Sequence, residues 1–191
     1  MKRITVFCGS SNGTKKEYRE QAYYLGKTLA IKNIGLVYGG ARIGLMGAVA
    51  DGALANGGEV IGVIPDFLQT KEIAHDSLSQ LIVTATMHER KTKMNELCDG
   101  VIALPGGFGT IEELFEMLTW AQLALHQKPI GILNTDGYFN NLIAFVQHQL
   151  DEQFIKPFHQ HLLIVGNTVD DLLEKMKLIN DNIERNEITL E

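Results

Sequence analysis

The stretch Val101-Ile102-Ala103-Leu104-Pro105-Gly106-Gly107-Phe108-Gly109-Thr110-Ile111-Glu112-Glu113 joins an apolar run to a glycine-rich turn and then to a helix-forming segment. This order predicts a buried strand, a glycine loop and the first turn of a helix. Glycine has no Cβ, so the backbone N–H groups of such a loop can approach a ligand closely. A helix N-terminus adds unpaired N–H donors and a partial positive charge. The stretch therefore predicts a site for an anion, most often a phosphate.

Two carboxylates, Glu112 and Glu113, follow the glycine loop directly. A loop that only binds phosphate gains nothing from added negative charge, whereas a site that stabilises a cationic transition state can use one carboxylate. Thr110 and Glu113 also have the Thr-x-x-Glu spacing of a capping box, which would make them purely structural. The three glycines favour a functional interpretation, because a simple helix cap does not need them.

Short apolar runs alternate with longer amphipathic segments along the rest of the chain. This pattern predicts strands at 4–8, 34–38, 59–64, 81–84, 101–104, 130–133 and 162–165, and helices at 14–32, 44–56, 87–98, 110–125, 138–151 and 169–180. Almost continuously apolar strands that alternate with helices indicate a parallel sheet covered on both faces. We therefore expect a Rossmann-like, doubly wound α/β fold in a single domain over 1–191.

Three loops are expected at the carboxyl edge of this sheet: Gly9-Ser10-Ser11, Gly39-Gly40 and the glycine loop after Leu104. Ligands of open parallel sheets bind at this edge, where the strand order reverses. The segment 39–44 lacks the G-x-G-x-x-G spacing of a dinucleotide site, and no glycine loop is followed by Lys-Ser or Lys-Thr. The sequence therefore predicts neither NAD binding nor ATP hydrolysis.

A second polar motif, Met87-His88-Glu89-Arg90-Lys91, follows the strand expected at 81–84. Thr86 and Glu89 again have the spacing of a capping box. Arg90 and Lys91 either belong to a solvated helix face or direct a guanidinium toward the site. The residues alone leave both interpretations open.

The helix expected at 110–125 is apolar on more than one side. Ile111, Leu114, Phe115 and Leu118 are predicted to face the sheet, and Met117 and Ala121 extend the apolar surface beyond one stripe. A helix with two apolar sides needs a second partner. Met46 and Trp120 are expected to lie in the core.

The bulk composition excludes several classes of protein. The chain of 191 residues has a formal net charge of −6, which argues against a broad nucleic-acid-binding surface. No apolar stretch is long enough to cross a membrane. The two cysteines, Cys8 and Cys98, have no metal-ligand spacing and indicate a reducing, cytoplasmic compartment. We expect neither a metal nor an organic cofactor.

Together, the motifs at 87–91 and 105–113 resemble the paired signature of the cytokinin-activating phosphoribohydrolases, the LOG family. The resemblance covers nearly the whole chain. It extends through Gly39-Gly40, Gly44-Leu45-Met46-Gly47, Thr119-Trp120-Ala121-Gln122, Lys128-Pro129-Ile130-Gly131 and Asp136-Gly137-Tyr138.

The resemblance implies hydrolysis of the N-glycosidic bond of a nucleoside 5′-monophosphate, which releases the free base and ribose 5-phosphate. The base would be a cytokinin-type adenine or plain adenine. The resemblance also implies a homodimer with its site near the interface, and it makes Arg90 and Glu113 catalytic. The substrate contacts that it implies are Glu72, Arg90, Lys91, Gly107, Phe108, Gly109, Thr110, Ile111, Glu112, Glu113 and Thr119.

Two rival functions remain beside this enzyme. The first is a non-catalytic carrier of a nucleotide or of the molybdenum cofactor, built on the same fold. A carrier needs the glycine loop but not the acid, so the pair Arg90 and Glu113 favours the enzyme. The second is the lysine decarboxylase label that many family members bear. We find no lysine in a convincing context for pyridoxal phosphate.

Overall fold

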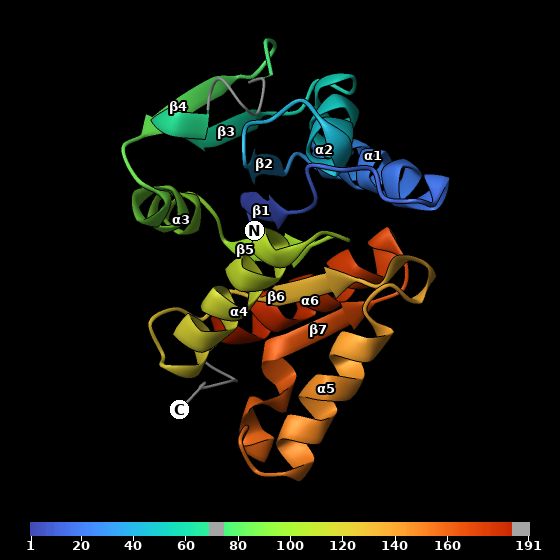
Figure 1. Cartoon of the computed structure of the whole chain (residues 1–191), viewed down its shortest axis with the longest axis vertical. Helices are drawn as coiled ribbons and strands as arrows, with labels where there is room; N and C mark the ends of the chain where they lie inside the picture. Colours follow the sequence, from blue (N-terminus) through green and yellow to red (C-terminus); the bar gives the residue numbers. More distant parts are fainter. Residues whose placement is uncertain (69–74, 185–191) are drawn as a thin grey trace.

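The computed structural model describes residues 1–68 and 75–184. Its strands form one seven-stranded sheet in the order β4-β3-β2-β1-β5-β6-β7 (Figure 1), and all neighbouring strands run parallel. The strands are β1 (Arg3–Phe7), β2 (Gly35–Tyr38), β3 (Val60–Pro65), β4 (Gln80–Thr84), β5 (Gly100–Ala103), β6 (Ile130–Leu133) and β7 (Leu163–Gly166). The predicted doubly wound α/β fold is confirmed.

Helices cover both faces of this sheet. They are α1 (Lys16–Ile31), α2 (Gly44–Leu54), α3 (Met87–Glu96), α4 (Phe108–Gln122), α5 (Asn140–Asp151) and α6 (Val169–Glu184), with short 3₁₀ helices η1 (Asp66–Leu68), η2 (Thr135–Gly137) and η3 (Pro157–Leu162). One core cluster joins the sheet to α1, α2 and α6, and a second joins it to α3, α4 and α5 (Figure 1). Among the described residues, no helix is long and apolar enough to cross a membrane.

Burial explains why the apolar runs predict the strands so well. The strands β2, β3, β5 and β6 are buried at every position, so both of their faces must be apolar. The edge strand β4 is only partly covered, and its Leu81 and Val83 are exposed. Every predicted strand is found, with ends that differ by one residue or less.

The start of α4 differs from the sequence prediction. The helix begins at Phe108, two residues early, and its N-cap is Gly107 without a side-chain hydrogen bond. Thr110 therefore lies inside the helix, so the capping-box interpretation of Thr110 and Glu113 is wrong. The local spacing could not show that Thr110 turns inward and is buried.

The other capping predictions have mixed outcomes. The capping box of α3 is confirmed, because the Glu89 N–H donates to Thr86 Oγ1 at 3.1 Å and the Glu89 carboxylate accepts from the Ala85 N–H at 2.9 Å. The helix expected at 14–32 begins two residues later, at Lys16, and its N-cap Lys15 makes no side-chain hydrogen bond.

The residues of α4 that pack against the sheet also differ from the predicted set. Leu114, Met117 and Ala121 are buried against the sheet. Ile111, Phe115 and Leu118 are only partly buried, and Ile111 and Leu118 pack at the edge of the same core cluster. The polar residues Thr110 and Glu113 are buried on the same side of the helix as the three buried apolar residues. The buried side of α4 therefore differs from the predicted one. Trp120, expected in the core, packs against it but is only partly buried.

The strand order places the glycine loops together. The chain builds the sheet outward from β1 to β4, then returns to the other side of β1 and continues from β5 to β7. The loops that follow β1 and β5 are therefore neighbours, and the Gly9 N–H donates to the Pro105 carbonyl at 3.0 Å. This is the topological switch point, where ligands of such sheets bind.

Candidate active site

A cavity of about 330 Å³ opens at the switch point. The loops after β1, β2 and β5 line it, together with Arg90 from α3 and the first turns of α4. The expected convergence of three loops at the carboxyl edge is thus confirmed. Strands far apart in sequence supply the walls, since β1, β2 and β5 are adjacent in the sheet.

Arg90 is buried, although it carries a charge. Its Nε donates to the Val63 carbonyl of β3 at 3.0 Å. Gly39 at the end of β2 makes room for the guanidinium, because a Cβ there would lie 2.3 Å from an Arg90 terminal nitrogen. The solvated-face interpretation is therefore wrong for Arg90. The backbone of two neighbouring strands directs its guanidinium into the cavity.

Glu113 faces Arg90 from the inner side of α4. Its Oε1 lies 3.7 Å from Arg90 Nη1, and the two side chains are only 11% and 8% exposed. Buried charges are tolerated when they are paired. The pair therefore brings a carboxyl group and a guanidinium, both largely buried, together in the lining of the cavity.

Cys8 is a cavity residue that the sequence analysis overlooked. It follows β1 directly and lines the cavity. Burial raises the pKa of its thiol, the charge of Glu113 raises it further, and Arg90 opposes the shift. The thiol therefore stays protonated at neutral pH and acts as an apolar wall. Its position at the end of a central strand was the signal that could have identified it.

Further apolar side chains complete the cavity. Leu68, Met87 and Met46 line it beside Cys8. Met46 is also buried in the core, as expected, so it has both roles. Phe108 stands at the rim with 98% of its surface exposed. Among the described residues nothing covers this ring, so it is available to a ligand or a second subunit.

The N-terminus of α4 supplies hydrogen-bond donors to the cavity. The N–H groups of a first helical turn have no acceptor within the helix, and Gly107 provides no side-chain cap. The start of α2 differs, because its Leu45 and Met46 N–H groups donate to the Gly9 carbonyl at 3.0 and 3.4 Å. A Cβ on Gly107 or Gly109 would meet no atom within 4 Å, so open space lies against both glycines.

Lys91 does not line the cavity. Its Nζ donates to Glu112 Oε1 at 2.6 Å and to Glu116 Oε1 at 3.0 Å, which ties α3 to α4. Burial lowers the pKa of Lys91, but the two carboxylates outweigh burial and raise the pKa above its ordinary value. Glu112 itself does line the cavity.

Two further predicted contacts, Ile111 and Thr119, are not among the residues that line the cavity. Ile111 packs against the second core cluster. Thr119 is two turns further along α4, where its hydroxyl donates to the Phe115 carbonyl at 2.7 Å. Glu72 lies outside the described residues.

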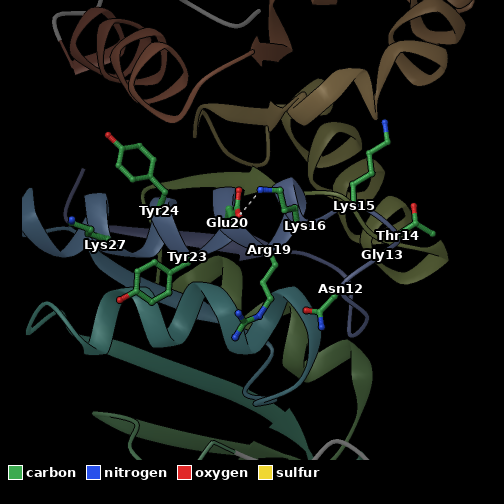
Figure 2. A pocket seen from close by; sticks show the side chains of 10 residues that line it. All are labelled: Asn12, Gly13, Thr14, Lys15, Lys16, Arg19, Glu20, Tyr23, Tyr24 and Lys27. Atoms are coloured by element: carbon green, nitrogen blue, oxygen red, sulfur yellow. Dashed lines mark ion pairs between the residues drawn. The ribbon is translucent and has the colours of Figure 1, made fainter.

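A larger hollow, of about 640 Å³, runs along α1 (Figure 2). Among the described residues, its lining comes from the segment 12–15 and from α1, including Arg19, Tyr23 and Lys27. Lys16 and Glu20 of α1 form an ion pair of 3.5 Å at this hollow, drawn as a dashed line in Figure 2. No loop at the carboxyl ends of β2 or β5 reaches this surface. The smaller cavity with Arg90 and Glu113 is therefore the candidate active site.

Solved structures share this fold. The molybdenum cofactor carrier protein from Chlamydomonas reinhardtii superposes with a TM-score of 0.72 at 24% identity, over 94% of this chain and 98% of that one. The molybdenum cofactor binding protein from Rippkaea orientalis gives a TM-score of 0.69 at 24% identity, over 94% and 98% of the two chains. At this level of identity the likeness establishes the fold alone.

Sequence relatives are much more similar. The family model described as "Possible lysine decarboxylase" matches residues 46–176. The probable cytokinin riboside 5′-monophosphate phosphoribohydrolase LOGL6 of Oryza sativa subsp. japonica is 48% identical over 176 residues, which cover 92% of this chain and 70% of the relative. The cytokinin riboside 5′-monophosphate phosphoribohydrolase LOG1 of Arabidopsis thaliana is 45% identical over 186 residues, 97% of this chain and 86% of the relative. With such matches over most of its length, the chain belongs to the cytokinin riboside 5′-monophosphate phosphoribohydrolase (LOG) family, whose family model bears the lysine decarboxylase description.

Proposed function

We propose that this protein hydrolyses the N-glycosidic bond of a nucleoside 5′-monophosphate and releases the free base and ribose 5-phosphate. The base is a cytokinin-type adenine or plain adenine. The observation that carries the proposal is the buried pair of Arg90 and Glu113, 3.7 Å apart, in a cavity that also contains a helix N-terminus. Relatives that are 45% and 48% identical and are named for this reaction support it.

The 5′-phosphate is proposed to bind at the start of α4. The N–H groups of residues 107–110 and the helix dipole attract an anion there, which matters in a chain of net charge −6. Glu113 lies six residues after Gly107, roughly 9 Å along the helix axis at 1.5 Å per residue. This separation matches a ribose phosphate that is bound by its phosphate at one end and reacts at C1′ at the other.

The chemistry follows from the charge that develops during bond cleavage. As the C1′–N bond lengthens, positive charge grows on C1′ and O4′, as in glycoside hydrolysis. The Glu113 carboxylate stabilises this charge and accepts a proton from the attacking water, whose oxygen bonds to C1′. The electrons of the C1′–N bond pass to the base, which takes up a proton from solvent, and Glu113 returns the proton of the attacking water to solvent. Arg90 compensates the charge of Glu113 and offers its remaining N–H groups to the substrate.

The wider set of substrate contacts is proposed to extend along α4. Glu112 lines the cavity and Lys91 holds Glu112 in place. Neither Ile111 nor Thr119 is among the residues that line this cavity. We propose that they belong to the part of the site that a second subunit completes, and that Glu72 contacts the substrate as the resemblance implies.

Release of adenine from AMP after removal of metals tests the reaction directly. The proposed hydrolysis needs only water, and the described residues contain no group of three His, Cys, Asp or Glu side chains placed to hold a metal. After exhaustive dialysis against EDTA, the full chain is expected to release adenine and ribose 5-phosphate from AMP as fast as an undialysed aliquot, measured by chromatography. No absorbance band of a pyridoxal aldimine is expected.

Two results would contradict this expectation in different ways. Activity that disappears on dialysis and returns with one divalent metal would contradict the metal-free mechanism. No release from AMP or from an N6-alkylated AMP by either aliquot would contradict the hydrolase and favour a carrier of the same fold.

We also propose a two-fold homodimer formed through α4 and α5. An apolar groove of about 250 Å³ lies between α4, α5 and η3, with Phe115 and Leu118 on its walls. No residue of α5 is buried, and Phe154 beside the groove is 83% exposed. Apolar surface of this kind marks an interface, and closed two-fold dimers are the commonest assembly.

Light scattering of the wild-type chain is expected to give the mass of a dimer. Phe115→Asp puts a charge into the proposed interface and is expected to give a monomer with weakened AMP hydrolysis. Ile31→Asp is the matched control, because Ile31 is 62% exposed on α1, on the opposite face of the sheet. A fully active wild-type monomer would contradict both the dimer and its role in completing the site.

The proposed setting is the cytoplasm. Cys8 and Cys98 are both free and buried, which suits a reducing compartment. The net charge of −6 gives no support to a nucleic-acid partner, and we propose neither nucleic acid nor membrane as a partner. The substrate is a small molecule.

A further inference from the structure

The motif Asp136-Gly137-Tyr138 follows β6 and has no part in the proposed chemistry. Asp136 and Gly137 both have positive φ angles, 51° and 71°, so the chain turns sharply before Tyr138. This turn brings the Tyr138 hydroxyl to the glycine loop, where it donates to the Gly106 carbonyl at 2.5 Å. The contact joins the loop after β6 to the loop after β5.

We infer that Tyr138 is a positioning residue, which fixes the orientation of the peptide unit between Gly106 and Gly107 and thereby holds the Gly107 N–H on the cavity side. In a planar trans peptide, the C=O and the N–H point in opposite directions. Gly107 lines the cavity and Tyr138 does not. A carbonyl held by Tyr138 on the outer side therefore leaves the N–H of the same peptide for a ligand on the inner side.

This peptide needs an external restraint because glycine stands on both sides of it. Glycine accepts a much wider range of backbone angles than other residues, so rotation of the shared peptide meets little steric resistance. The neighbouring parts of the loop are already fixed. The Pro105 carbonyl accepts from the Gly9 N–H at 3.0 Å, and the Gly107 carbonyl accepts from the Ile111 N–H at 3.2 Å. The Gly106 carbonyl lies between these two, and Tyr138 holds it.

The ring of Tyr138 is itself held in place. It packs edge-on against Tyr18 of α1, with ring centroids 5.6 Å apart, and against Phe139 at 4.9 Å. The Phe139 N–H donates to the Asn134 side chain at 2.8 Å, and Asp136 forms an ion pair with Lys15. The hydroxyl therefore reaches Gly106 from a fixed position.

Removal of this single hydroxyl tests the inference. The inference rests on the proposed phosphate site, so the main readout is binding rather than turnover. Tyr138→Phe is expected to weaken the binding of ribose 5-phosphate by about two- to tenfold, the usual effect of one hydrogen bond. The binding of free adenine is expected to stay unchanged. Isothermal titration calorimetry measures both.

Tyr24→Phe is the matched control. It removes a hydroxyl that donates to Asp170 at 3.1 Å, between α1 and α6 and outside the cavity. This variant is expected to bind both ligands as the wild type does. Equal weakening of ribose 5-phosphate and adenine in Tyr138→Phe, or no weakening of either, would overturn the inference.

Turnover separates this inference from the proposed reaction. If the hydrolase is correct, Tyr138→Phe raises KM for AMP by the same factor and changes kcat less. A wild-type chain without hydrolytic activity would refute the reaction, while a selective loss of ribose 5-phosphate binding in Tyr138→Phe would still support the role of Tyr138.

Discussion

Glu113→Gln is expected to lower kcat for AMP by about two to four orders of magnitude, the contribution typical of a catalytic acid–base group. Glutamine keeps the size and shape of the side chain but removes the charge, and that charge acts mainly on the cationic transition state. Binding of the nucleotide is expected to change much less than turnover. Initial rates of adenine release and calorimetric titration with AMP measure the two effects separately.

Glu116→Gln is the matched control for this change. Glu116 lies on the same helix and pairs with Lys91 at 3.0 Å, but it does not line the cavity. The substitution is expected to leave kcat within tenfold of the wild type. Thermal melting of both variants is needed, because Glu113→Gln also leaves Arg90 buried without its partner's charge. Near-normal base release by a folded Glu113→Gln variant would remove Glu113 from catalysis.

AMP is expected to be hydrolysed with a kcat/KM at least about 10²-fold above that of adenosine. Two charge-assisted hydrogen bonds from backbone N–H groups to the phosphate account for a factor of this size. Gly107→Val is expected to abolish most of this preference, because its side chain fills the space where the phosphate would bind. Comparable turnover of adenosine and AMP by the wild type would contradict the proposed phosphate site.

Gly107→Val is expected to fold normally, so its effect on binding can be interpreted directly. Gly107 has φ −92°, and a Cβ there would meet no atom within 4 Å. Gly106 is the informative contrast, since a Cβ there would lie 2.1 Å from Thr110 Oγ1. Gly106→Ala is therefore expected to lower the melting temperature as well as binding, whereas Gly107→Val lowers binding alone.

Predictions from local sequence patterns succeeded where burial imposes a pattern on neighbouring residues. Strands covered on both faces must be apolar at every position, so runs such as 101–104 predict β5 directly. The capping box at Thr86 was also visible, because the donor and acceptor are three residues apart. The same spacing at Thr110 gave a wrong prediction. The N-cap of α4 is Gly107, which has no side chain to form a capping hydrogen bond.

The walls of the cavity were harder to predict. Cys8 and Leu68 belong to segments with no functional motif, and they reach the cavity only because β1 and β3 lie beside the strands that carry the motifs. Lys91 shows the converse. It stands beside Arg90 in the sequence, but its side chain points to Glu112 and Glu116 rather than into the cavity.

The sequence by itself determined the class of fold and the glycine loop, which depend on apolar periodicity and short spacings that act over a few residues. The choice of Arg90 and Glu113 came from the family resemblance, because the residues alone left the role of Arg90 open. Only the tertiary structure decided that Arg90 and Glu113 meet at 3.7 Å, that Gly39 makes room for the guanidinium, and that Tyr138 reaches Gly106. The two residues of these contacts are 23, 51 and 32 positions apart in the sequence, respectively. The order of strands in the sheet decides which of these distant residues meet, and no local sequence pattern encodes that order.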